Sequence, residues 1–145
     1  MGARTQAREA ALAMLYQRDL SGDGTEQVIA AFLDGGLAEE ALDRQARRFA
    51  EHLVRGVVRR MDELDGLIRA GSTNWRLERM AAVDRNVLRI ALFELLDEPD
   101  TPAAVILDEA VELAKLFGGE ESGAFVNGLA DGIRRRLESG ELVRR

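Results

Sequence analysis

Several residue types that build common functional sites are absent or rare in this 145-residue chain. It has no cysteine, which fits a reducing compartment. A chain of this length needs no disulfide, because it buries about 70% of its unfolded surface. His52 is the only histidine, so a metal site would need carboxylates to complete it. We therefore expect a structural or surface role for His52, and no metal or cofactor.

Long apolar runs are missing as well. No stretch approaches the roughly 20 apolar residues of a membrane-spanning helix. The N-terminus lacks the apolar core of a signal peptide. The sequence thus predicts a soluble, cytoplasmic protein that makes no contact with a membrane.

Proline is scarce, with two residues in one linker, and no strand-like alternation of apolar and polar residues appears. Apolar residues instead recur at spacings of three and four along most of the chain, which is typical of amphipathic helices. We expect an all-α fold of six to seven helices in a single domain over residues 1–145. A break at Gly71–Asn74 should separate an N-terminal bundle of about residues 1–70 from a C-terminal bundle of about 72–138.

Turn and cap residues mark where the helices should begin and end. Three helices are expected before the break and three or four after it. In chain order they are about 4–20, a short helix beginning at Thr25, a long helix of about 38–70, about 83–96, one opened by Thr101 and Pro102, and a last one capped by Ser122. The long helix is expected to be continuous, and Gly118-Gly119 should end the helix before Ser122.

The net charge of −6 argues against non-specific binding to nucleic acid, but the charge is unevenly distributed. Residues 97–121 carry eight acidic residues and one basic residue, Lys115. Arg44–Arg60 carries six arginines and one acidic residue. Arg44, Arg48, Arg55 and Arg59 project from one side of the expected helix, opposite its apolar stripe. This side is either a solvated helix face, the reading that we favour, or a ridge that follows RNA phosphates.

No group of residues has the spacing of a catalytic site. Asp108 and Glu112 lie one helical turn apart, but on a polar face that amphipathicity already explains. The glycines match neither GxGxxG nor GxxxxGK[ST], and no Ser/His/Asp set is evident. We therefore expect a binding module and not an enzyme.

Two features remain open between a core role and a binding role. Arg4 and Arg8 continue the apolar stripe of Leu12 and Leu15, so they either cover the edge of the core or line an interface. Phe125 is expected in the first turn of the last helix. There its ring either packs in the core, which composition favours, or stacks on an unpaired base beside an anion-binding helix end.

Five words of sequence, in this order and spacing, resemble the NusB family of bacterial transcription antitermination factors over nearly the whole chain. They are RxxxRE at Arg4–Glu9, LY at Leu15–Tyr16, DRNVLRIALFEL at Asp84–Leu95, DEAVELAK at Asp108–Lys115 and FVNG at Phe125–Gly128. The resemblance implies two small helical bundles, which agrees with the expected break.

The resemblance also implies a function. Proteins of this family pair with a small-subunit ribosomal protein, which doubles as the elongation factor NusE, and bind single-stranded boxA RNA. The pair joins the antitermination complex on RNA polymerase and supports ribosomal RNA transcription. The positions implied to bind RNA are Arg4, Arg8, Phe125 and Asn127. Those implied to face the protein partner are Tyr16, Asp84, Phe117 and Glu121.

The chain departs from the family pattern at two places. Thr5 and Gln6 interrupt the N-terminal arginines, and Gly123-Ala124 stands where a basic residue often precedes the FVNG word. We therefore expect weak RNA binding by the chain alone and stronger binding with a basic partner, which the acidic residues 97–121 would attract.

Two other functions fit such a sequence less well. One is a structural helical module that forms a homodimer with a masked RNA face, because some NusB-like proteins self-associate. The other is the domain that precedes RNA cytosine methyltransferase domains in some proteins. The sequence contains no glycine-rich cofactor loop, so we do not expect catalysis.

Overall fold

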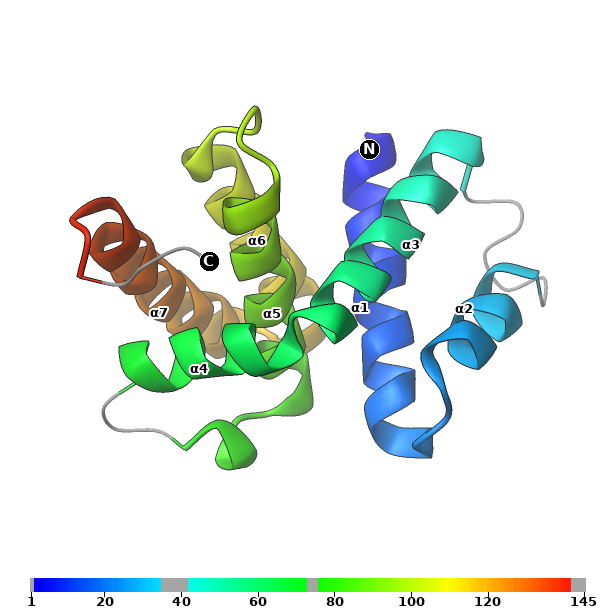
Figure 1. The fold of residues 1–145 in the computed structure, drawn as a ribbon, viewed down its shortest axis with the longest axis horizontal. Helices are drawn as coiled ribbons and strands as arrows, with labels where there is room; N and C mark the ends of the chain where they lie inside the picture. The colour runs from blue at the N-terminus through cyan, green and yellow to red at the C-terminus, as the bar shows by residue number, and fades with distance from the viewer. Residues whose placement is uncertain (1, 35–41, 73–75, 142–145) are drawn as a thin grey trace. The chain divides into compact units, whose positions relative to one another are not determined.

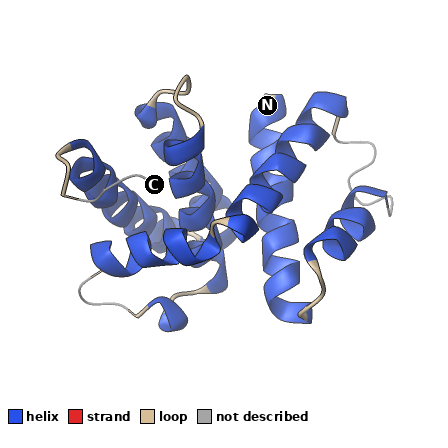
Figure 2. Cartoon of the chain, in the orientation of Figure 1, coloured by secondary structure: helices blue, strands red, loops and turns tan. Residues whose placement is uncertain are grey.

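The computed structural model describes residues 2–34, 42–72 and 76–141. Within these ranges it contains seven α-helices, one short 3-10 helix and no strand (Figure 2). The expected all-α class with six to seven helices is confirmed. No helix in the described part of the chain is long and apolar enough to cross a membrane.

The chain forms two compact units, Met1–Arg59 and Arg60–Arg145. The first unit contains α1 (Ala3–Ser21), α2 (Thr25–Asp34) and α3 (Arg44–Arg59) (Figure 1). The second contains α4 (Met61–Gly71), the 3-10 helix η1 (Leu77–Arg79), α5 (Ala82–Asp97), α6 (Ala103–Gly118) and α7 (Glu120–Glu138).

The first unit is built on the packing of α1 against α3, and α2 makes smaller contacts with both. Small side chains lie on the facing sides of the two long helices. Ala7 and Ala11 of α1, and Ala46 and Ala50 of α3, are at most 1% exposed. Because alanine brings no bulk, the helices can approach closely, and buried leucine, valine and methionine side chains fill the space around these positions.

The second unit surrounds α5 with α4, α6 and α7. Every residue of α5 from Asn86 to Leu95 is buried, so this helix is enclosed on all sides. The polar residues among them need partners because they are removed from water. Arg89 donates hydrogen bonds to both carboxylate oxygens of Asp65 on α4, at 2.8 and 3.0 Å, and to Oδ1 of Asn86 at 3.0 Å.

The expectation of one continuous helix over about 38–70 is wrong in its described part. The chain leaves helical geometry at Arg60 (φ −105°, ψ 18°), where α3 ends and α4 begins. Neither glycine nor proline stands there, and the Arg60 side chain is held by Glu63 at 2.8 Å. The apolar spacing continues through the break, so periodicity alone could not detect it. Residues 38–41 lie outside the described residues.

The remaining helix ends follow their cap residues closely. Gly118 ends α6 and Gly119 has φ +87°, as its glycine predicted. Two start positions differ from expectation. The N-cap of α6 is Pro102 and not Thr101, and α7 begins at Glu120 and not after Ser122.

Candidate RNA and partner sites

A pocket in the first unit lies where α1 and α3 begin, and Figure 1 shows that both helices start at the same end of this unit. Its volume is about 440 Å³. The residues that line it are Ala3, Arg4, Gln45, Ala46, Arg48 and Phe49. The charged side chains in this lining are both arginines, so the pocket suits an anionic ligand.

The two N-terminal arginines differ in their exposure to solvent. The guanidinium carbon of Arg4 lies 4.2 Å from the centre of the Phe49 ring, and that of Arg8 lies 5.6 Å from it. Arg8 is only 4% exposed, whereas Arg4 is exposed and lines the pocket. Arg8 thus covers the edge of the core, and Arg4 is the one that a ligand can reach.

The other arginines of α3 differ in how far they are neutralised. Arg55 donates two hydrogen bonds to the Glu26 carboxylate, at 2.8 and 2.9 Å, and these lower the pKa of Glu26 below its usual value. Arg47 donates to the Leu33 carbonyl at 2.7 Å and lies 3.2 Å from Asp34. The interpretation of this side of α3 as a solvated helix face therefore describes the end that carries Arg55.

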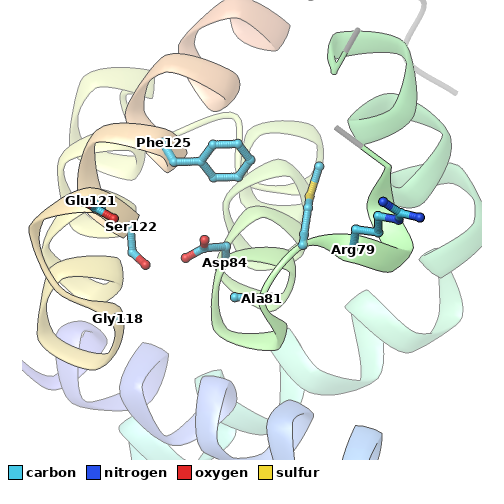
Figure 3. A pocket seen from close by; sticks show the side chains of 8 residues that line it. Arg79, Ala81, Asp84, Gly118, Glu121, Ser122 and Phe125 are labelled. Atoms are coloured by element: carbon cyan, nitrogen blue, oxygen red, sulfur yellow. The ribbon is translucent and has the colours of Figure 1, made fainter. Parts of the chain in front are cut away.

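A second pocket, of about 340 Å³, lies in the second unit (Figure 3). It is lined by Arg79, Met80, Ala81, Asp84, Gly118, Glu121, Ser122 and Phe125. Asp84 and Ser122 point toward the same space, and the ring of Phe125 extends over it (Figure 3). The pocket therefore brings together two residues implied to face the protein partner, Asp84 and Glu121, and one implied to bind RNA.

One atom in this pocket lacks a hydrogen bond. Oδ1 of Asp84, in the first turn of α5, is buried and finds no donor among the described residues. A buried carboxylate oxygen without a donor is destabilising, so a ligand that supplies an N–H or O–H group there would bind favourably. This makes Asp84 the residue of the pocket with the clearest requirement for a partner.

The expected position of Phe125 in the first turn of its helix is wrong. Because Gly119 connects α6 directly to α7, the helix begins at Glu120 and Ser122 is its third residue instead of its cap. Phe125 therefore lies in the second turn, away from the free backbone N–H groups. Its ring is partly buried and lines the pocket, so it is not wholly enclosed in the core, and its stacking on a base stays a prediction.

Besides Arg8, three of the residues implied by the resemblance line neither pocket. Asn127 is exposed on α7, Phe117 is 49% exposed at the end of α6, and Tyr16 is 39% exposed on α1. Aromatic residues are enriched in protein–protein interfaces, which fits the exposed rings of Phe117 and Tyr16. Their roles stay predictions.

Sequence reasoning missed other residues that line the pockets. Arg79 carries no local signal, since it ends a 3-10 helix that only the fold brings to α7. Gln45 precedes the apolar stripe of α3 without distinguishing context. Phe49 lies on the apolar stripe of its helix, and nothing in its spacing indicated that two arginines would stack on it.

Comparison with known proteins identifies the family. A model of the NusB family matches residues 5–135. The chain belongs to the NusB family. It is 52% identical to the transcription antitermination protein NusB of Sorangium cellulosum, over 94% of this chain and 95% of that protein.

Solved NusB structures have the same fold. The structure of T. maritima NusB superposes with a TM-score of 0.83 at 38% identity, over 96% of this chain and 97% of that one. A chain from a complex of the antitermination factors NusB and NusE with double-stranded RNA gives a TM-score of 0.82 at 27% identity. It covers 93% of this chain and 98% of its own. The family and fold implied by the sequence words are thereby confirmed.

Proposed function

We propose that this protein is an RNA-binding transcription antitermination factor. In this role it pairs with the ribosomal protein NusE, binds boxA RNA within the antitermination complex on RNA polymerase, and supports ribosomal RNA transcription. The proposal rests on the pocket in the second unit, together with membership of a family whose relatives are antitermination proteins. In this pocket, two carboxylates and an aromatic ring at positions that the family resemblance implies to be functional lie in one lining.

We assign the RNA contacts to Arg4, Phe125 and Asn127, and a supporting position to Arg8, which is 4% exposed. Arg4 supplies an exposed guanidinium for a phosphate, and Arg8 supports it from below on the same ring. Phe125 offers the accessible part of its ring to an unpaired base, which is how proteins bind single-stranded RNA. Asn127 lies two residues further along α7, where its exposed amide can donate and accept.

The partner contacts are assigned to Tyr16, Asp84, Phe117 and Glu121. Ribosomal proteins are basic, and the acidic groups of the second unit give complementary charge. Asp84 needs a donor for its buried oxygen, and Glu121 lies in the same pocket. The exposed rings of Tyr16 and Phe117 provide apolar contact area.

This function requires no catalytic chemistry, and we assign none. Binding, orientation and assembly on a transcribing polymerase are sufficient for an antitermination factor. Because bacterial transcription takes place in the cytoplasm, we expect the protein to act there.

The decisive experiment measures the affinity of a boxA RNA for the chain alone and for the chain with NusE, at two salt concentrations. We expect weak binding alone, a clear increase with NusE, and a decrease at higher salt. Arg4→Ala is the suitable variant, since Arg4 is exposed and its loss should leave the fold intact. If NusE gives no increase and Arg4→Ala gives no loss, the proposal is wrong.

A homodimer with a masked RNA face remains the alternative. Light scattering of the protein alone, over a wide range of concentrations, decides this point. A monomer at every concentration excludes the homodimer. A stable dimer that dissociates when NusE is added would make self-association a resting state of the same function.

A further inference from the structure

The first-unit pocket lies beside α3. None of the five sequence words lies in this helix, and none of the positions implied to be functional does. Three of its lining residues come from the outer face of α3: Gln45, Arg48 and Phe49. Its volume of about 440 Å³ lies within the range of small-molecule and cofactor sites. Gln45 and Arg48 are exposed, so their polar groups are accessible to a ligand.

Arg4 is held in place before any ligand arrives. Its guanidinium stacks on Phe49 at 4.2 Å, and the Phe49 ring is itself stacked against His52, with 6.4 Å between ring centres and 24° between planes. A guanidinium that is already oriented loses less conformational entropy when it binds a phosphate. The pocket thus has a positioned cation on its α1 side.

Arg48 supplies a second cation from the α3 side. Unlike Arg47 and Arg55, it pairs with none of the acidic residues in the described part of the chain. The two portions of this arginine face therefore differ in how far their charge is neutralised. The Arg55 portion is neutralised, and the Arg48 portion lines a pocket that contains no carboxylate among its lining residues.

We propose that Arg4, Gln45 and Arg48, with the ring of Phe49 beneath Arg4, form a nucleotide subsite for single-stranded RNA. Arg4 and Arg48 bind one phosphate from its two sides. The Gln45 amide, which both donates and accepts, binds the edge of the adjoining base. Unpaired RNA is the ligand that presents a phosphate and an accessible base edge together. This inference rests on the proposed function and adds α3 to its RNA contacts.

The test compares two arginines of the same helix in the full-length protein bound to NusE. Arg48→Gln removes the subsite cation, and Arg59→Gln removes another exposed arginine of α3, outside the pocket. We expect Arg48→Gln to weaken boxA binding about tenfold and to reduce the slope of log K against log salt by about one. Arg59→Gln should weaken binding less than about twofold. Circular dichroism and thermal unfolding confirm that both variants fold.

The base contact is tested with Gln45→Ala and a series of boxA RNAs, each with one base replaced. Wild-type protein should discriminate at one position that Gln45→Ala no longer distinguishes, while the salt slope stays unchanged. If Gln45→Ala discriminates between bases as the wild-type protein does at every position, Gln45 is not part of the subsite.

The outcomes separate this inference from the proposed function. If the wild-type complex binds boxA RNA and Arg4→Ala weakens it, but Arg48→Gln behaves like Arg59→Gln, the subsite is wrong and the proposed function stands. Equal losses for Arg48→Gln and Arg59→Gln indicate a general effect of charge, which also overturns the subsite. If the wild-type complex does not bind boxA RNA, both proposals are wrong.

Discussion

At the scale of single residues, the charged side chains differ most in their exposure to solvent. The side chains of Arg89 and Asp65 are 7% and 13% exposed, whereas those of Arg55 and Glu26 are 44% and 70% exposed. The two pairs have similar bidentate geometry. Their contributions to stability should nevertheless differ, because only the buried pair leaves an unsolvated charge behind when one partner is removed.

Arg89→Met should lower the free energy of unfolding by about 3–5 kcal/mol, because it strands the Asp65 carboxylate against α5. Arg55→Met, the matched loss of an exposed arginine, should change it by less than about 1 kcal/mol. Urea unfolding followed by circular dichroism measures both. The double variant Arg89→Met with Asp65→Leu should recover much of the loss. No recovery would mean that packing, and not the stranded charge, sets the effect.

Asp131 should titrate at unusually low pH. Its hydrogen bond from Arg134, together with the charges of Arg134 and Arg135, lowers its pKa below the ordinary value of 3.8. A lowered pKa in the folded state adds stability that is present above about pH 3.8 and is lost as the pH falls through the folded-state pKa. Carboxyl NMR should therefore give a midpoint below 3.8, and Arg134→Gln should raise it. A midpoint at or above 3.8 in the wild-type protein contradicts the assignment.

At the scale of helices, glycine predicted the end of α6 correctly, whereas the cap residues Thr101 and Ser122 misplaced the starts of α6 and α7. Gly118-Gly119 marks the end of α6 because the chain reverses there through φ +87°, which glycine adopts without strain. The break at Arg60 has no such residue, and the apolar stripe of α3 continues into α4. Helical periodicity reports which face is buried, and it cannot report a turn that preserves that face.

The α6–α7 connection should be sensitive to an added methyl group. At Gly119 the positive φ makes any side chain strained, so Gly119→Ala should cost about 1–2 kcal/mol. Gly132→Ala is the matched control within α7. A Cβ there meets nothing within 4 Å, so it should stabilise the protein by about 0.5–1 kcal/mol. Thermal and urea unfolding of both variants should show shifts of opposite sign. A shift of the same sign in both would contradict this account of the connection.

The candidate sites were predictable only in part, for the same reason. Arg4, Asp84 and Phe125 came from the family's sequence words, and two pockets contain them. Arg79 and Gln45 line these pockets only because separate helices meet there, and no local pattern encodes such a meeting. The stacking of Arg4 and Arg8 on Phe49 likewise depends on the packing of α1 against α3.

At the scale of the whole molecule, the basic residues are assigned to RNA and the acidic residues to NusE. The net charge of −6 opposes binding of RNA by the chain alone, while basic residues gather around Arg4 and acidic ones around Asp84. Long-range repulsion from RNA is screened by salt and offset by a basic partner. Association with NusE should therefore come before, or together with, tight binding of RNA.

If RNA and NusE bind different residues, one substitution should weaken NusE binding and another should weaken RNA binding. Asp84→Asn removes a carboxylate charge and should weaken NusE binding about tenfold, with RNA binding reduced only through the loss of the partner. Arg4→Ala should weaken RNA binding by the assembled complex and leave NusE affinity unchanged. Isothermal titration with NusE, followed by RNA titration at saturating NusE, measures the two effects. Equal loss of both ligands in either variant would show that the two surfaces are not independent.

The enclosure of α5 has a consequence for the timing of these contacts. A helix buried from Asn86 to Leu95 can open only when its whole unit unfolds, and Asp84 lies two residues before this buried run. Arg4 lies in the first turn of α1, and helix ends fray on far shorter timescales. Amide hydrogen exchange should therefore be slowest along α5 and fast around Arg4. The partner surface around Asp84 therefore adjoins the most protected helix of its unit, whereas RNA would meet an arginine in a terminal turn whose side chain is held in place by the Phe49 ring.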